Sequence, residues 1–164
     1  MDRVRRVVLG LGSNLGDRLA QIASAVRAFD ATRDLRVFRR SETYESPPAG
    51  GPPQGDYLNA AVLSMTALPA QEILARTRDV ERALGRVRPD PVRWGPRTLD
   101  VDILWIEGEI VDEPDLHVPH RRLHERPFAL RPLLDVAPHA EDPRTGEPYA
   151  SLPAAIAPLR RFTA

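Results

Sequence analysis

Apolar and polar positions along the chain repeat with periods of two and of about 3.6 residues, which predicts both strands and helices. Strands are predicted over residues 4–11, 35–45, 57–67 and 98–106. Helices are predicted over residues 18–31 and 69–84. The order β-α-β-β-α-β is typical of a ferredoxin-like sandwich, so the expected fold class is α+β.

The chain after Gly108 is expected to add C-terminal elaborations to this sandwich. A short strand or hairpin is predicted near Ile110, and short helices around residues 120–125, 129–136 and 152–157. A length of 164 residues suits one compact domain with a sizeable core, and no internal repeat or linker is evident. We therefore expect residues 1–164 to form a single domain.

Composition narrows the class of protein. Hydrophobic residues make up 42% and charged residues 28%, which is ordinary for a soluble globular protein. No apolar run approaches the length of a membrane span, and the N-terminus lacks the apolar segment of a secretory signal. The absence of cysteine excludes disulfides and thiolate metal sites. We expect a cytoplasmic protein with no membrane partner, and a monomer, because no surplus apolar stripe is evident.

The charge balance argues against a nucleic-acid partner. The chain has 23 basic and 23 acidic residues, which leaves no net positive field. All the basic residues are arginine, and arginine-rich codon usage is the simplest explanation for most of them. Because the chain contains no lysine, a P-loop with its Gly-Lys-Ser/Thr ending is excluded. ATP binding would therefore need a different structural device.

The segment Arg93–Ile103, read as R-W-G-P-R-T-L-D-V-D-I, contains two aspartates at alternate positions of a predicted strand. Strand side chains alternate between faces, so Asp100 and Asp102 should share one face. The apolar residues beside them, through Trp105, should point to the other face. Two neighbouring carboxylates repel each other unless a cation lies between them, and hard divalent cations bind carboxylate oxygens. The whole segment indicates a metal pair, whereas D-x-D alone would favour a half-exposed strand with solvated aspartates.

Three side chains just before the aspartates are suited to a nucleotide. Arg93 and Arg97 have planar guanidinium groups that bind phosphate oxygens, and Trp94 offers a flat apolar surface. Together with the aspartates they indicate nucleotide-dependent phosphoryl chemistry.

Two long connections and one strand face are further candidates for a site. Residues 47–55 form a Pro- and Gly-rich segment, the proline loop, and residues 85–96 form the arginine loop. Long loops in a compact domain are commonly lids. Tyr57 and Asn59 should share one face of their strand, where a ring and an amide would suit a flat heterocycle.

Seven motifs, taken in order, resemble those of the 6-hydroxymethyl-7,8-dihydropterin pyrophosphokinase family of folate biosynthesis. They are G-L-G-S-N-L-G-D-R at 10–18, S-P-P at 46–48, D-Y-L-N-A at 56–60, G-R-V-R at 85–88, the segment 93–103, V-P-H at 118–120 and R-x-F at 126–128. The resemblance implies that the terminal two phosphates of ATP move together to the pterin hydroxymethyl oxygen, with two Mg²⁺ ions, and that AMP is released.

The resemblance also implies roles for individual residues. Both magnesium ions would be held by Asp100 and Asp102. The catalytic set would be Arg86, Arg97, Asp100 and Asp102. ATP would be bound by Glu81, Arg88, Trp94, Arg97, His120 and Arg126. The pterin would be bound by Ser46, Pro47, Ala49, Tyr57, Asn59, Trp94 and Phe128.

Two other classes of function stay open at the level of the residues. A non-catalytic ferredoxin-like module that binds a small molecule or RNA would not need two aspartates on one strand face beside an arginine-bearing loop. A metal-dependent enzyme could instead move only the γ-phosphate or cyclise a nucleotide. The nucleotide product distinguishes these reactions, because pyrophosphoryl transfer yields AMP and an ordinary kinase yields ADP.

Overall fold

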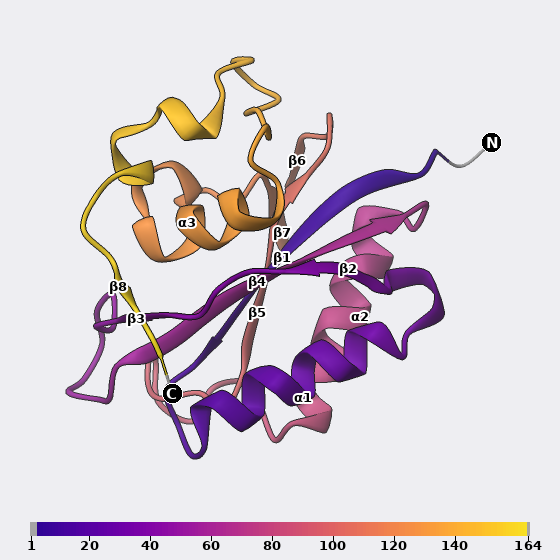
Figure 1. Cartoon of the computed structure of the whole chain (residues 1–164). Helices are drawn as coiled ribbons and strands as arrows, with labels where there is room; N and C mark the ends of the chain where they lie inside the picture. The colour runs from indigo at the N-terminus through magenta and orange to yellow at the C-terminus, as the bar shows by residue number, and fades with distance from the viewer. Residues whose placement is uncertain (1–2, 164) are drawn as a thin grey trace.

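A computed structural model describes residues 3–163, which are built around one antiparallel sheet of six strands (Figure 1). The strands are β1 (Arg5–Ser13), β2 (Val37–Arg40), β3 (Tyr44–Ser46), β4 (Tyr57–Thr66), β5 (Asp100–Ile106) and β8 (Arg160–Arg161). They lie in the order β5-β1-β4-β3-β8, and β2 also pairs with β4. A separate hairpin is formed by β6 (Val111–Glu113) and β7 (Leu116–Val118).

Helices cover both faces of this sheet. The helices α1 (Arg18–Asp30) and α2 (Ala70–Ala83) pack on one face, and α3 (Pro127–Val136) packs on the other (Figure 1). The first core, beneath α1 and α2, contains side chains such as Leu9, Ile22 and Ile73. The second core, beneath α3, contains side chains such as Val8 and Leu133. The element order and antiparallel sheet confirm the expected ferredoxin-like α+β fold, with the C-terminal elaboration as a third layer.

Local sequence signals explain where α1 begins and which side it buries. The Asp17 carboxylate accepts a hydrogen bond from the backbone N–H of Ala20 at 3.1 Å, which caps the helix. Its buried residues Ile22, Ala25 and Phe29 recur at helical spacing and face the sheet. Within residues 3–163, no helix has the length and apolar character required to cross a membrane.

The predicted second strand, residues 35–45, is divided into β2 and β3 by Ser41. Its hydroxyl accepts a hydrogen bond from the Ala61 N–H at 2.8 Å and donates one to the Glu42 carbonyl at 2.6 Å. A serine side chain that competes with backbone groups in this way interrupts a regular ladder. The strand resumes as β3, which ends at Ser46, directly before the proline loop.

Two of the short C-terminal helices differ from expectation. Instead of helices around 120–125 and 152–157, the structure has 3₁₀ turns at Leu123–Glu125 and Pro153–Ala155, with another at Tyr149–Ser151. Such segments are too short to form the repeated hydrogen bonds of an α-helix. The helix expected over 129–136 is α3, and the expected hairpin near Ile110 is β6–β7.

The orientation expected for Trp105 was wrong. Val101 and Ile103 belong to the first core, as alternation predicts, but Leu104 and Trp105 both belong to the second. The pairing of β5 with β1 shifts here, since Leu9 pairs with Ile103 and Val8 pairs with Trp105. Leu104 is thus the extra residue of a β-bulge, which reverses the alternation after Ile103.

Candidate active site

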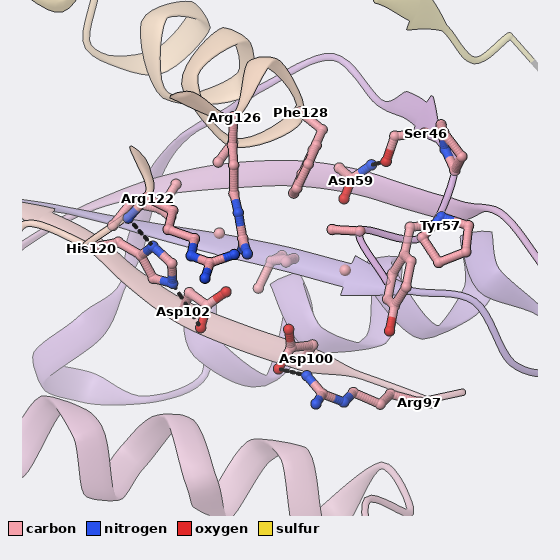
Figure 2. Close-up of a pocket in the computed structure, with 18 of the residues that line it drawn as sticks. Ser46, Tyr57, Asn59, Arg97, Asp100, Asp102, His120, Arg122, Arg126 and Phe128 are labelled. Atoms are coloured by element: carbon pink, nitrogen blue, oxygen red, sulfur yellow. Dashed lines mark hydrogen bonds and ion pairs between the residues drawn. The ribbon is translucent and has the colours of Figure 1, made fainter. Parts of the chain in front are cut away.

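A cavity of about 340 Å³ lies on the α3 face of the sheet, where β1, β4 and β5 meet the two long loops. Figure 2 shows the side chains that converge on it from β5, β4 and α3. Most of the residues implicated by the sequence line this cavity. They are Ser46, Pro47, Ala49, Tyr57, Asn59, Trp94, Arg97, Asp100, Asp102, His120, Arg126 and Phe128.

The two aspartates of β5 share one face, as alternation predicts, but their electrostatic surroundings differ (Figure 2). Asp100 Oδ1 accepts a hydrogen bond from Arg86 at 2.9 Å and forms an ion pair with Arg97 at 3.3 Å. For Asp102, desolvation and then the negative charges of Asp100 and Glu81 raise the carboxyl pKa to about 8. The Asp102 carboxylate is therefore the negative charge that this site leaves without full compensation.

The two carboxylates fit a hard divalent cation whose coordination shell is completed by a substrate. Within residues 3–163, no three His, Cys, Asp or Glu side chains come together as a self-sufficient metal site. Mg²⁺ is commonly bound by one or two carboxylates together with substrate phosphates. Asp100 and Asp102 supply two such carboxylates, and the raised pKa of Asp102 indicates that a nearby cation would be favourable.

His120 and Arg126 present donors above the aspartates. The His120 Nδ1 accepts a hydrogen bond from the Arg122 N–H at 3.2 Å, so the ring proton of the neutral side chain lies on Nε2. Burial, followed by the positive charge of Arg126, lowers the His120 pKa. Its Nε2 lies 4.0 Å from Asp102 Oδ1. A neutral His120 thus offers an N–H donor beside a guanidinium, an arrangement suited to phosphate oxygens.

The side chain of Asn59 is fixed so that its oxygen faces the cavity (Figure 2). Its amide nitrogen donates to Ser46 Oγ at 2.8 Å and to the Tyr44 carbonyl at 3.3 Å. Because a backbone carbonyl only accepts, this contact determines which atom of the amide is the nitrogen. Asn59 Oδ1, which has no hydrogen-bond partner among residues 3–163, is available to a ligand donor.

Flat apolar surfaces lie on either side of this amide. Phe128 enters the cavity from α3 and Tyr57 from β4 (Figure 2). On the sheet below, a Cβ atom at Gly12 would lie 3.3 Å from the Tyr57 ring. The glycine therefore leaves Tyr57 in place and keeps the cavity floor open. Two rings and an acceptor are the groups that a flat, amino-substituted heterocycle requires.

The proline loop and the arginine loop contact each other at the rim of the cavity. Gln54 donates to the Trp94 carbonyl at 2.8 Å and accepts from the Asn14 amide at 2.8 Å. Asn14 also accepts from the Arg97 N–H at 2.9 Å. Trp94, which lies in this contact, has a φ of 56° and a largely exposed ring. The loops thus close one side of the site together.

Glu81, Arg86 and Arg88 lie outside this cavity, behind β5. Glu81 is 1% exposed and accepts from Arg86 at 3.1 Å, from Arg88 at 2.7 Å and from the Val101 N–H at 2.9 Å. Arg86 bridges Glu81 to Asp100 and also bonds Asp90 at 2.9 Å. In this structure the buried Glu81 and Arg86, with the half-exposed Arg88, support the aspartate strand from behind, and the roles implied for the three residues stay predictions.

Two polar residues of the cavity were not identified from the sequence. Arg122 lines it two residues after the V-P-H motif, and Gln54 lines it from the proline loop. A signal for Gln54 was present, because it is the one polar side chain in a segment otherwise made of Pro, Gly and Ala. Arg122 gave no such signal among the many surface arginines.

A second cavity of about 350 Å³ adjoins the first. The two share Asp102, His120, Arg122 and Arg126. Its remaining wall combines apolar and polar side chains, namely Leu74, Val101, Ile103, Leu116, Asp115, His117 and Arg121. The four shared groups therefore lie between a cavity with two aromatic rings and a cavity whose other residues are both aliphatic and polar.

Comparison with known proteins gives concordant results. Residues 8–138 match the family model described as 7,8-dihydro-6-hydroxymethylpterin-pyrophosphokinase. A protein of Methylorubrum extorquens named 2-amino-4-hydroxy-6-hydroxymethyldihydropteridine pyrophosphokinase is 47% identical over 133 residues, covering 81% of this chain and 83% of that protein. The Bacillus subtilis protein of the same name is 40% identical over 137 residues, covering 84% and 81%.

A solved structure extends the likeness to the fold. Wild-type HPPK-DHPS of Plasmodium falciparum, crystallised with pteroate, superposes with a TM-score of 0.68 at 13% identity. The match covers 91% of this chain and 42% of that much longer one, so it bears on the fold alone. The family model and the two bacterial relatives bear on identity as well. This chain belongs to the 7,8-dihydro-6-hydroxymethylpterin-pyrophosphokinase family.

Proposed function

We propose that this chain transfers the terminal two phosphates of ATP, as one unit, to the hydroxymethyl oxygen of 6-hydroxymethyl-7,8-dihydropterin, with Mg²⁺ and release of AMP. Family membership makes it a pyrophosphokinase of folate biosynthesis. The observation that carries the finer proposal is the pair of adjoining cavities that share Asp102, His120, Arg122 and Arg126. One cavity suits a flat heterocycle, the other suits a nucleoside, and the shared groups suit the phosphates between them.

The residues of the chain would act mainly by alignment and charge neutralisation. Asn59 and the rings of Tyr57 and Phe128 would hold the heterocycle in the cavity that Asp102 also lines. Arg97, Arg126 and the His120 Nε2–H would bind phosphate oxygens and stabilise the charge that develops during transfer. Mg²⁺ held by Asp100 and Asp102 would supply further charge neutralisation and lower the pKa of the attacking hydroxyl.

The nucleotide product tests this proposal directly. The chain is incubated with Mg²⁺, ATP and 6-hydroxymethyl-7,8-dihydropterin, and the nucleotides and pterins are separated by chromatography. We expect AMP to form in step with the pterin diphosphate, and only when both substrates and the metal are present. ADP would indicate transfer of the γ-phosphate alone, and a cyclic nucleotide would indicate a cyclase. A folded sample that forms no product would indicate a binding module.

Asn59→Ala is expected to weaken pterin binding by ~10–100-fold and to leave ATP binding unchanged, because a buried hydrogen bond to the ligand edge is lost. The measurement is calorimetric titration of each ligand separately. Gln21→Ala, which truncates an amide on α1 away from the cavity, is the matched control. An equal loss for both ligands would contradict the assignment of Asn59 to the pterin.

The monomeric state and the cytoplasmic location expected from the sequence stay predictions. Size-exclusion chromatography with light scattering checks the first, and cell fractionation checks the second. The proposed partners are the two small-molecule substrates, and the balanced charge supports the expectation that nucleic acid is not a partner.

A further inference from the structure

The proline loop, residues 47–55, is held within itself chiefly by one side chain, Gln54, whose amide nitrogen donates to carbonyls of the loop. It contains four prolines, which have no N–H to donate, and three glycines, which restrict the backbone least. Nevertheless Pro47 and Ala49 line the part of the cavity assigned to the heterocycle. Besides the contacts of Gln54 at the rim, the position of this wall therefore depends on how the two ends of the loop are held.

Arg18, the first residue of α1, connects the two ends of the loop. Its Nη1 donates to Glu45 Oε2 at 2.7 Å and to the Asp56 carbonyl at 2.9 Å. Glu45 lies in β3 just before the loop, and Asp56 directly precedes β4. One guanidinium nitrogen thus bridges the strand that enters the loop and the strand that leaves it, next to the paired residues Ser46 and Tyr57.

The C-terminal strand supports the same arginine from the other side. The Phe162 ring lies 5.7 Å from the Arg18 guanidinium, within reach of a cation–π contact. The Phe162 N–H donates to the Thr43 carbonyl at 2.8 Å, and Arg160 lies 3.5 Å from Glu45. Strand β8 pairs with β3, so these contacts add to a continuous edge of the sheet. This segment lies beyond residues 8–138, which match the family model.

The contacts of Arg18 are sufficiently shielded from water to contribute to the stability of the loop ends. The side chain of Arg18 is 28% exposed and that of Glu45 is 13% exposed, so water screens the pair less than it screens an open surface pair. Hydrogen bonds between charged groups are also stronger than neutral ones. Arg18 itself does not line either cavity, so any effect on ligand binding must pass through the loop.

We propose that Arg18, held by Glu45 and Phe162, is a positioning residue for the neck of the proline loop, by which we mean residues 45–46 and 56–57 at its two ends. By fixing the neck, Arg18 fixes the wall of the cavity against which the pterin binds. That the ligand is a pterin rests on the proposed function. That Arg18 holds the neck in place does not depend on that function.

The test compares Arg18→Ala with Arg27→Ala, which removes an exposed arginine from the same helix. We expect the pterin Kd and KM of Arg18→Ala to rise about tenfold, which corresponds to about 1.4 kcal/mol. The ATP Kd should stay within about twofold of the wild type, and kcat should change less than KM, because the ATP cavity and the aspartates are untouched. Hydrogen exchange of the paired amides of β3 and of the first residues of β4 should become faster, while exchange in β1 should not.

The proposal is overturned if the pterin Kd of Arg18→Ala equals that of Arg27→Ala, if ATP binding weakens by the same factor, or if exchange in β3 and at the start of β4 is unchanged. Phe162→Ala, which removes the ring and no charge, is the second variant if Arg18→Ala fails to fold, and the same criteria apply. If the wild-type chain binds no pterin, the proposed function fails, whereas the exchange comparison still decides whether Arg18 holds the neck.

Discussion

Asp102→Asn is expected to reduce turnover by ~10³-fold and, without metal, to raise the melting temperature of the chain. The loss of turnover follows from the removal of a carboxylate that would help to neutralise phosphate charge through Mg²⁺. The gain in stability follows from the Asp102 pKa, which folding raises from 3.8 to about 8. The folded state therefore binds this proton more tightly than the unfolded state. The ionised carboxylate destabilises the metal-free fold increasingly as pH rises from about 4 to about 8.

The measurements are steady-state kinetics at saturating Mg²⁺ and calorimetric unfolding at pH 8 with a chelator. Asp100→Asn is the matched variant, because it changes the same group two residues away but removes a partner of Arg86 and Arg97. We expect it also to impair turnover, yet to lower the melting temperature. Near-normal turnover in both variants would refute the metal assignment. A lower melting temperature for Asp102→Asn would show that its carboxylate is not the uncompensated charge of the site.

Arg86→Ala is expected to destabilise the fold by about 3 kcal/mol, because it leaves the buried Glu81 without one of its partners. For a chain of this size, that corresponds to a melting temperature lower by roughly 6–12 °C. Turnover should fall as well, since Arg86 also holds Asp100 at 2.9 Å. Thermal unfolding followed by circular dichroism measures the first effect.

Arg82→Ala is the control for Arg86→Ala. Arg82 lies near the end of α2 in an exposed pair with Asp79, so its removal should change the melting temperature little. Arg88→Ala should give an intermediate result, because Arg88 contacts Glu81 from a half-exposed position. If Arg86→Ala keeps the wild-type melting temperature and loses turnover, Arg86 acts on the substrate in a state with different contacts, and support of the aspartate strand is not its main role.

Most of the fold could be predicted from the sequence, because the periods of the apolar residues are set by the backbone itself. The four strands and two helices of the sandwich begin and end within a few residues of expectation. The errors in the predicted strands arise where a single residue alters the hydrogen-bond pairing between neighbouring strands. Ser41 substitutes its hydroxyl for a backbone partner, and Leu104 forms a bulge that turns Trp105 to the opposite face. Neither event changes the composition pattern from which strands are predicted.

The site could be predicted where one strand contains two of its residues. Asp100 with Asp102, and Tyr57 with Asn59, share a face by alternation alone. The sequence could not show that Glu81 and Arg86 face each other behind β5, because that contact depends on how α2 packs against the strand. It also could not show which of the many arginines faces the cavity, so Arg122 was missed.

The position of α3 has a consequence for how this chain tolerates mutation. Arg126 and Phe128 lie at its first turn, and Leu130 and Leu133 of the same helix fill the second core. Substitutions beneath α3 must therefore preserve both the stability of the layer and the orientation of two side chains that line the cavity. Beneath α1, whose buried side chains Ile22, Ala25 and Phe29 line neither cavity, we expect sequence drift to be limited mainly by stability. The part of this chain with the most freedom to change is therefore the layer beneath α1, which lies away from both cavities.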